Sequence, residues 1–132
     1  MDEKRVRSLP LFERLGRRQC KLVAQWADEV DVPAGKRLAT EGDFGYEFFV
    51  IEQGTADVRH HGSLVAELGP GDFFGEIALT RSERRSADVV ATSSMSLVVL
   101  TRAGFRAMQR ELPNVAQEIE RAVDERLART PA

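Results

Sequence analysis

Turn signals recur through the middle of the chain, and their spacing restricts the fold more than any other feature. Between residues 31 and 100, short apolar segments alternate with clusters rich in glycine, proline and aspartate. These clusters are PAG at 33–35, EGD at 41–43, QG at 53–54, HG at 61–62 and GPGD at 69–72. Short strands between turns spaced roughly 8–12 residues apart are typical of an all-β sandwich or barrel. The sequence therefore predicts antiparallel strands over about 31–100.

Alternation within these segments indicates the strands themselves. Apolar residues occupy every second position, as a strand with one buried face requires. They are Phe48, Val50, Ala56, Val58, Leu64, Ala66 and Leu68. MSLVVL at 95–100 is the last clear strand.

Helices are predicted before the strands. Residues 9–16 predict a short helix that begins after Ser8 and ends at Gly16. Residues 19–30 predict a second helix, because their apolar residues recur at helical spacing. These are Leu22, Val23, Trp26, Ala27 and Val30, which we expect in the core.

Helices are also predicted after the strands. Residues 102–111 predict one helix, and Pro113 suits the first turn of the next. Within 113–129, a single apolar stripe of Val115, Ile119, Val123 and Leu127 repeats every four residues. This stripe can pack on its own domain or form the seam of a homodimer.

A length of 132 residues fits one domain over 1–132. Its N-terminal helices span about 9–30, its β-roll about 31–100 and its C-terminal helices about 102–129. The predicted fold class is mainly β, an antiparallel, jelly-roll-like β-roll with flanking helices. Small barrels of this kind hold a small ligand or act as interaction modules.

Composition excludes several classes of function. Nineteen basic and twenty-one acidic residues give a net charge of −2, without the basic bias of sequence-independent nucleic-acid binding. No apolar run reaches the length of a membrane span. The single cysteine, Cys20, allows no internal disulfide, and we expect a buried structural thiol in a cytoplasmic protein.

No catalytic or metal-binding set is evident, so neither an enzyme nor a metal site is expected. His60 and His61 are adjacent, so strand alternation predicts opposite faces for their side chains, near a solvent-exposed turn. The pair also lacks the spacing of metal ligands.

The segment GDFFGEIALTRSERRSADVV at 71–90 combines features of an anion site. Gly75 permits a close backbone approach, and 76–80 predict a short helix whose N-terminus attracts anions. Arg85 can bring its guanidinium to the same anion, beside the Ser86 hydroxyl and the Ala87 N–H. Glu76 would repel a bare phosphate but can accept a hydroxyl donor, so a sugar phosphate or nucleotide is favoured.

Each feature also has a purely structural alternative. Glutamate is common in the first turn of a helix, and Gly75 can serve as a simple turn. A charge run is usually a solvated loop, which here would include Arg81, Glu83, Arg84 and Arg85.

The segment FGEIALTRSERRSADVVA at 74–91, here called the cassette segment, resembles the phosphate-binding cassette of the cyclic nucleotide-binding domain family. That cassette runs F-G-E-(L/I)-A-L, several variable residues, then R-(S/A/T)-A-(T/S)-V, and the match has no gap. VPAGKRLATEGD, FFVIEQGTADV and LGPGDFFGE at 32–43, 48–58 and 68–76 resemble the family's early strands and turns. The resemblance extends over about 9–128.

The resemblance implies residue roles. Glu76 would accept the ribose 2′-hydroxyl, and Arg85 would pair with the cyclic phosphate. Further contacts to these groups would come from Gly75, Ile77, Ala78, Ser86 and Ala87. Val58 and Val65 would line the base pocket, with plain β-core as the alternative.

Two positions depart from the family pattern. Arg84 stands where proline is frequent, and Asp88 stands where threonine or serine is usual. An Asp88 side chain directed at the ligand would oppose the phosphate, and strand alternation alone leaves its direction open.

The implied function is a non-catalytic regulatory module that needs no cofactor and signals by moving its C-terminal helices. Threonine after the arginine is associated with cyclic GMP, so Ser86 favours cyclic AMP without excluding cyclic GMP. Its partner would be an unidentified effector protein or a second copy bound through 113–129.

Two alternatives remain open. The 20 residues after Leu112 are too few for a DNA-binding domain of about 50 residues or more, so no direct DNA binding is expected. The chain can still be a fragment of a larger cyclic AMP-responsive transcription regulator, channel or kinase. It can also be a degenerate domain that serves protein–protein contact without a nucleotide.

Overall fold

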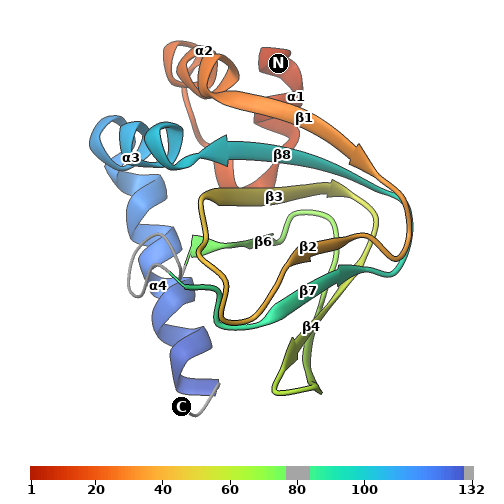
Figure 1. Ribbon diagram of the computed structural model, residues 1–132. Helices are drawn as coiled ribbons and strands as arrows, with labels where there is room; N and C mark the ends of the chain where they lie inside the picture. The colour runs from red at the N-terminus through yellow and green to blue at the C-terminus, as the bar shows by residue number, and fades with distance from the viewer. Residues whose placement is uncertain (77–83, 130–132) are drawn as a thin grey trace.

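A computed structural model describes residues 1–76 and 84–129, with side chains through residue 125. In this part of the chain, eight strands form two antiparallel four-stranded sheets (Figure 1). The first sheet has the order β1 (Ala27–Val32), β8 (Met95–Thr101), β3 (Glu47–Gln53) and β6 (Phe73–Phe74). The second has the order β2 (Arg37–Ala39), β7 (Asp88–Ala91), β4 (Ala56–His60) and β5 (Ser63–Leu68). The predicted antiparallel β-roll with flanking helices is confirmed.

The N-terminal helices differ from the prediction for 9–16. The chain forms α1 (Glu3–Ser8), a single 3₁₀ turn η1 (Pro10–Phe12) and α2 (Arg17–Trp26). Helix α1 begins early because the Asp2 carboxylate accepts the backbone N–H of Lys4 at 2.8 Å and caps it. Ser8 therefore ends a helix instead of starting one, and Gly16 precedes α2 instead of closing a helix.

The predicted helix over 19–30 is too long at its C-terminal end. Helix α2 ends at Trp26, and β1 then pairs with β8 from Ala27 opposite Leu100 to Val32 opposite Met95. Pairing with a strand so distant in sequence overrides the local helical spacing. Val30 consequently lies on the surface, 39% exposed, and not in the core.

The C-terminal helices match their predicted bounds. They are α3 (Arg102–Glu111) and α4 (Pro113–Arg129). Thr101 caps α3 by accepting the backbone N–H of Gly104 at 3.2 Å. The stripe residues Val115, Ile119 and Val123 are buried against their own domain, whereas the Leu127 side chain lies outside the described residues.

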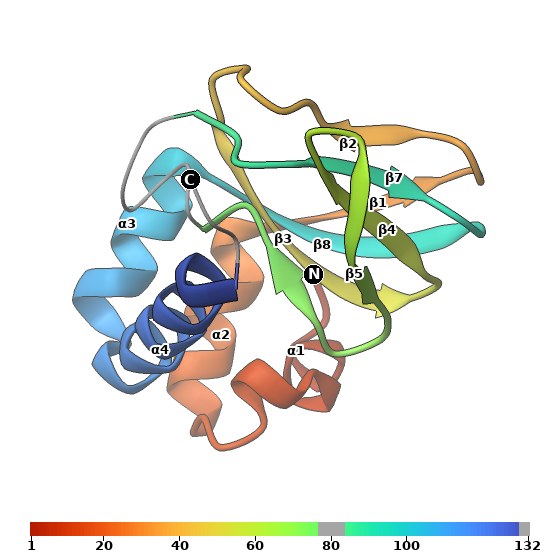
Figure 2. The same cartoon turned by 90° about the horizontal axis from the view of Figure 1, so that it is seen from below.

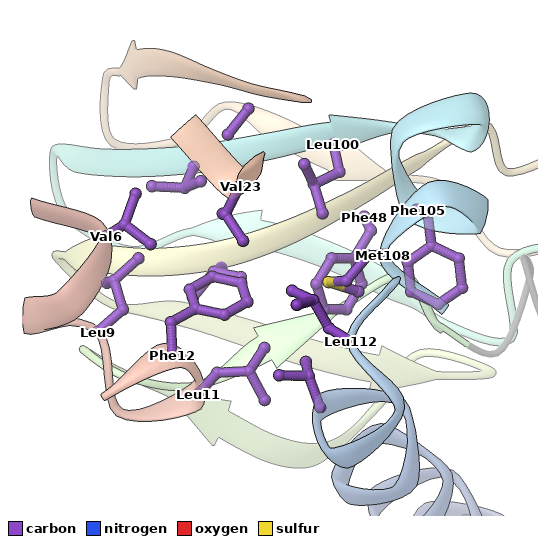
Figure 3. Packing of buried hydrophobic residues seen from close by; sticks show 14 of the residues in the cluster. Val6, Leu9, Leu11, Phe12, Val23, Phe48, Leu100, Phe105, Met108 and Leu112 are labelled. Atoms are coloured by element: carbon purple, nitrogen blue, oxygen red, sulfur yellow. The ribbon is translucent and has the colours of Figure 1, made fainter. Parts of the chain in front are cut away.

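The first sheet has a hydrophobic core on each face. All helices of the described chain lie on its outer side (Figure 2), where Phe48 and Val50 of β3 join the cluster shown in Figure 3. Phe49 and Ile51 of the same strand face the second sheet instead. Strand β3 is therefore buried on both faces, so the one-sided burial predicted from alternation is wrong for this strand.

Two further predictions concern the helices. Cys20 is a buried free thiol in α2, as expected. None of the helices in the described ranges is both long enough and apolar enough to cross a membrane.

Candidate functional site

The candidate site begins where β6 leaves the first sheet. Phe73 and Phe74 pair with Val50 and Phe49 of β3, and Gly75 then takes a left-handed φ of +96°. Glu76 has a helical conformation. Ile77, Ala78 and the rest of the helix predicted at 76–80 lie outside the described residues.

Arg85 reaches this point from the other end of the cassette segment. Its guanidinium donates through Nη1 to the Gly75 carbonyl at 3.3 Å and through Nη2 to the Glu47 carbonyl at 2.9 Å. Its backbone N–H donates to the Asp43 carbonyl at 2.7 Å, and its own carbonyl accepts the N–H of Gly42 at 2.9 Å. The loop between β2 and β3, visible beside the start of β7 in Figure 1, therefore holds Arg85 in place.

Glu76 and Arg85 are the buried charged side chains among the residues with described side chains, with exposures of 1% and 9%. Burial lowers the pKa of Arg85 from its ordinary value, and the carboxylates of Glu47 and Glu76 oppose this effect. Buried charges are costly unless they are paired and hydrogen-bonded. The solvated-loop alternative is therefore wrong for Arg85, whose guanidinium contacts the Gly75 carbonyl and whose charge interacts with that of the buried Glu76.

Ser86 and Ala87 follow Arg85 and are half-buried. The Ser86 carbonyl oxygen lies 2.9 Å from Nδ1 of His60. The cassette segment is thereby linked to the end of β4 by a residue that the sequence reasoning did not include in the site.

The two residues predicted for the base pocket have different surroundings. Val58 is half-buried and packs against the core between the sheets. Val65 is 46% exposed and lies where the pairing of β4 with β5 shifts register.

Arg84 and Asp88, the two residues that depart from the family pattern, both contact neighbouring segments. Arg84 is exposed, donates to the Gly42 carbonyl at 2.8 Å and lies over the Phe44 ring at 4.3 Å. The Asp88 carboxylate accepts the Glu41 backbone N–H at 2.7 Å and lies 3.2 Å from the guanidinium of Arg37. These two contacts, the backbone N–H first, lower the pKa of Asp88. Asp88 is thus held by β2 and the loop after it.

The prediction that His60 and His61 point to opposite faces is wrong. Their ring centroids lie 3.9 Å apart, and each Nδ1 lies near a carboxylate oxygen of Glu41. His61 has left the strand: it and Gly62 form the two-residue turn between β4 and β5, with φ angles of 50° and 81°. Positive φ at both turn residues is usual in tight hairpins. The His-Gly pair at 61–62 was therefore the sequence signal that could have predicted this turn.

Replacement of Gly75 by alanine should destabilise the domain. A Cβ there would lie 2.6 Å from the Glu47 carbonyl oxygen and 2.7 Å from Nη1 of Arg85, in addition to the strained φ. We expect the free energy of unfolding to fall by about 1–3 kcal/mol, so the melting temperature measured by calorimetry should be several degrees lower. Gly35→Ala is the matched control, because its φ is +87° but its Cβ would meet open space. Equal losses in the two variants would contradict the close approach at Gly75.

The chain is similar to known proteins in sequence and in fold. The model of the cyclic nucleotide-binding domain matches residues 29–111. A cAMP-dependent protein kinase regulatory subunit of Eremothecium gossypii is 35% identical over 104 residues, which are 78% of this chain and 23% of the relative. A cyclic nucleotide-gated potassium channel of Rhizobium etli is 33% identical over 126 residues, 96% of this chain and 35% of the channel.

A solved structure of a related protein has the same fold. The crystal structure of the Thermus thermophilus catabolite activator protein superposes with a TM-score of 0.78 at 32% identity, over 90% of this chain and 58% of that one. The chain spans only about a quarter to a third of the length of the two curated relatives. Because the family model covers well over half of it, the chain belongs to the cyclic nucleotide-binding domain family.

Proposed function

We propose that the chain is a single, non-catalytic regulatory domain over 1–132 that binds a cyclic nucleotide, cyclic AMP in preference to cyclic GMP, and needs no cofactor. The observation that carries this proposal is that the buried guanidinium of Arg85 donates to the carbonyl of Gly75, the residue before buried Glu76, and that the charges of the two side chains interact. A carboxylate and a guanidinium set together in this way suit a ligand that has both a hydroxyl donor and an anionic phosphate.

The proposed contacts follow from the donors and acceptors present. A guanidinium has five N–H donors, and the carbonyls of Gly75 and Glu47 take two of them in the described contacts. The others can bind the cyclic phosphate, together with groups of Ser86 and Ala87. An ionised Glu76 only accepts hydrogen bonds, so it selects the ribose hydroxyl. We assign backbone contacts to Gly75, Ile77 and Ala78, and the base to Val58 and Val65.

Cyclic AMP is the proposed ligand for two reasons. Serine at position 86 stands where threonine would favour cyclic GMP. The relative from Eremothecium gossypii, 35% identical, is named for its dependence on cyclic AMP.

A short structural path can carry the signal from Arg85 to α3. Arg85 donates to the carbonyl of Glu47, and the ring of the next residue, Phe48, packs in a tilted arrangement against Phe105 of α3 with a centroid distance of 5.0 Å. A ligand that binds the remaining donors of this guanidinium and shifts its position changes how β3 packs against α3. We propose that α3 and α4 then shift as the output of the domain.

The recipient of this output is an effector protein or a second copy of the chain. The buried stripe of α4 packs within its own domain, so a homodimer through 113–129 would use the exposed side of α4. Regulation of a kinase, a channel or a transcription regulator would each require a longer protein of which this domain is a part.

Saturating cyclic AMP should raise the melting temperature of the domain. A ligand that binds only the native state adds about 2.7 kcal/mol of stability at one hundred times its Kd. Differential scanning calorimetry with cyclic AMP measures this increase, and linear 5′-AMP is the control for nonspecific nucleotide effects. An unchanged melting temperature at millimolar cyclic AMP would instead support the degenerate domain.

A further inference from the structure

We propose that Glu41, His60 and His61 form a binding site for a divalent transition cation, with Zn²⁺ as its chemical type. Glu41 comes from the loop after β2, His60 from the end of β4, and His61 from the β4–β5 turn. They meet beside Ser86 of the cassette segment. Two imidazoles and one carboxylate are a ligand set that zinc sites use, with a fourth position open to water or another ligand.

The distances within this cluster fit coordination. Nδ1 of His60 lies 3.2 Å from Oε1 of Glu41, and Nδ1 of His61 lies 3.0 Å from Oε2. All three candidate ligand atoms lie within 4.8 Å of one another. Ligand atoms bound at about 2.0–2.2 Å to a tetrahedral zinc ion are roughly 3.3 Å apart. A cation therefore needs only small side-chain movements to bind all three.

The backbone already holds two of the three ligands. The N–H of Glu41 donates to the Asp88 carboxylate, and the N–H of His61 donates to Oε1 of Glu41 at 2.9 Å. His61 is fixed further by the tight turn that it forms with Gly62. The nearby carboxylate of Asp88, partly balanced by Arg37, also makes the surroundings favourable for a cation.

His60 connects this site to the cassette segment. Its Nδ1 lies near two acceptors, the Ser86 carbonyl at 2.9 Å and the Glu41 carboxylate, so this nitrogen carries the ring hydrogen. Nε2 of His60 has no hydrogen-bond partner among the described residues, so the ring is held through Nδ1. The same nitrogen cannot bind a metal and donate to Ser86. Metal binding therefore removes one hydrogen bond from the cassette segment.

Metal binding is tested first without nucleotide. Untagged protein, freed of metal by a chelator, is titrated with Zn²⁺ by calorimetry, and with Co²⁺ while the visible spectrum is recorded. We expect one Zn²⁺ per chain, a Co²⁺ spectrum of four-coordinate geometry without a thiolate band, and at least ten-fold weaker Zn²⁺ binding by His61→Asn and Glu41→Gln. Asparagine tolerates the left-handed φ of position 61, so the turn is retained.

Glu67→Gln, an exposed carboxylate on β5, is the matched control and should bind Zn²⁺ like the wild type. Zn²⁺ binding that is equal in the wild type and both cluster variants would overturn the site, as would a thiolate band assigning the metal to Cys20.

The link to the cassette segment rests on the proposed function and is tested separately. Cyclic AMP affinity is measured with Zn²⁺ and with a chelator. Loss of one hydrogen bond predicts about three- to ten-fold weaker nucleotide binding with Zn²⁺, and no such change in His61→Asn. Equal affinities in the wild type would overturn the link while leaving the metal site standing. Absence of cyclic AMP binding even in chelator would count against the proposed function alone.

Discussion

Replacing Arg85 with alanine is expected to weaken cyclic AMP binding by roughly 10- to 150-fold. A hydrogen bond to a charged group contributes about 1.5–3 kcal/mol, and the guanidinium is the one buried cation among the side chains described here. The substitution also removes a positive charge that interacts with the buried carboxylate of Glu76. Calorimetric titration of the variant measures the change in Kd directly.

The control for this variant is one position away. Arg84→Ala removes the same formal charge from an exposed side chain that lies over Phe44. It should alter the Kd little, because solvent screens an exposed charge. A Kd that is unchanged in Arg85→Ala, or equally weakened in both variants, would contradict a phosphate contact by Arg85. Melting curves without ligand separate a folding defect from a binding defect.

Replacing Glu76 with alanine is expected to abolish discrimination between cyclic AMP and its 2′-deoxy analogue. In the wild type, loss of the ribose hydroxyl should weaken binding about ten-fold or more, because a buried carboxylate would lose its donor. In Glu76→Ala that carboxylate is absent, so the two nucleotides should bind with similar Kd values. The ratio of the two Kd values is the quantity to compare, because general damage to the site weakens the binding of both nucleotides by the same factor and leaves the ratio unchanged.

Glu47→Gln serves as the matched control for Glu76. The Glu47 side chain is exposed, although its charge acts on Arg85 and its backbone carbonyl accepts from that guanidinium. This substitution lowers the negative charge around Arg85 but keeps the backbone contact, so the nucleotide ratio should match the wild type. A preserved ratio in Glu76→Ala would rule out the ribose role.

The strands were predictable because their signals are local. Turn glycines and apolar runs placed MSLVVL at β8, and Pro113 located the start of α4. The N-terminal boundary failed because one side chain, Asp2, caps a helix earlier in the chain. The boundary at Ala27 failed because pairing with β8, a strand distant in sequence, decides it. Local pattern therefore located the elements, and long-range pairing set several of their ends.

The candidate site, too, was predicted only in part from the sequence. Residue type and order indicated Gly75, Glu76 and Arg85, and the fold brings Gly75 and Arg85 into contact. The burial of Arg85 could not be predicted from the sequence, because it depends on how the loop after β2 packs against this residue. The cluster around His61 was missed because strand alternation was extended into a turn, where a positive φ redirects the side chain.

Isothermal titration calorimetry of the wild-type domain with cyclic AMP and with cyclic GMP is the decisive test of cyclic nucleotide binding. We expect saturable binding of one nucleotide per chain, with a lower Kd for cyclic AMP than for cyclic GMP. A lower Kd for cyclic GMP would contradict the base preference assigned to Ser86. Absence of saturable binding by either nucleotide at millimolar concentration would contradict the proposed function itself.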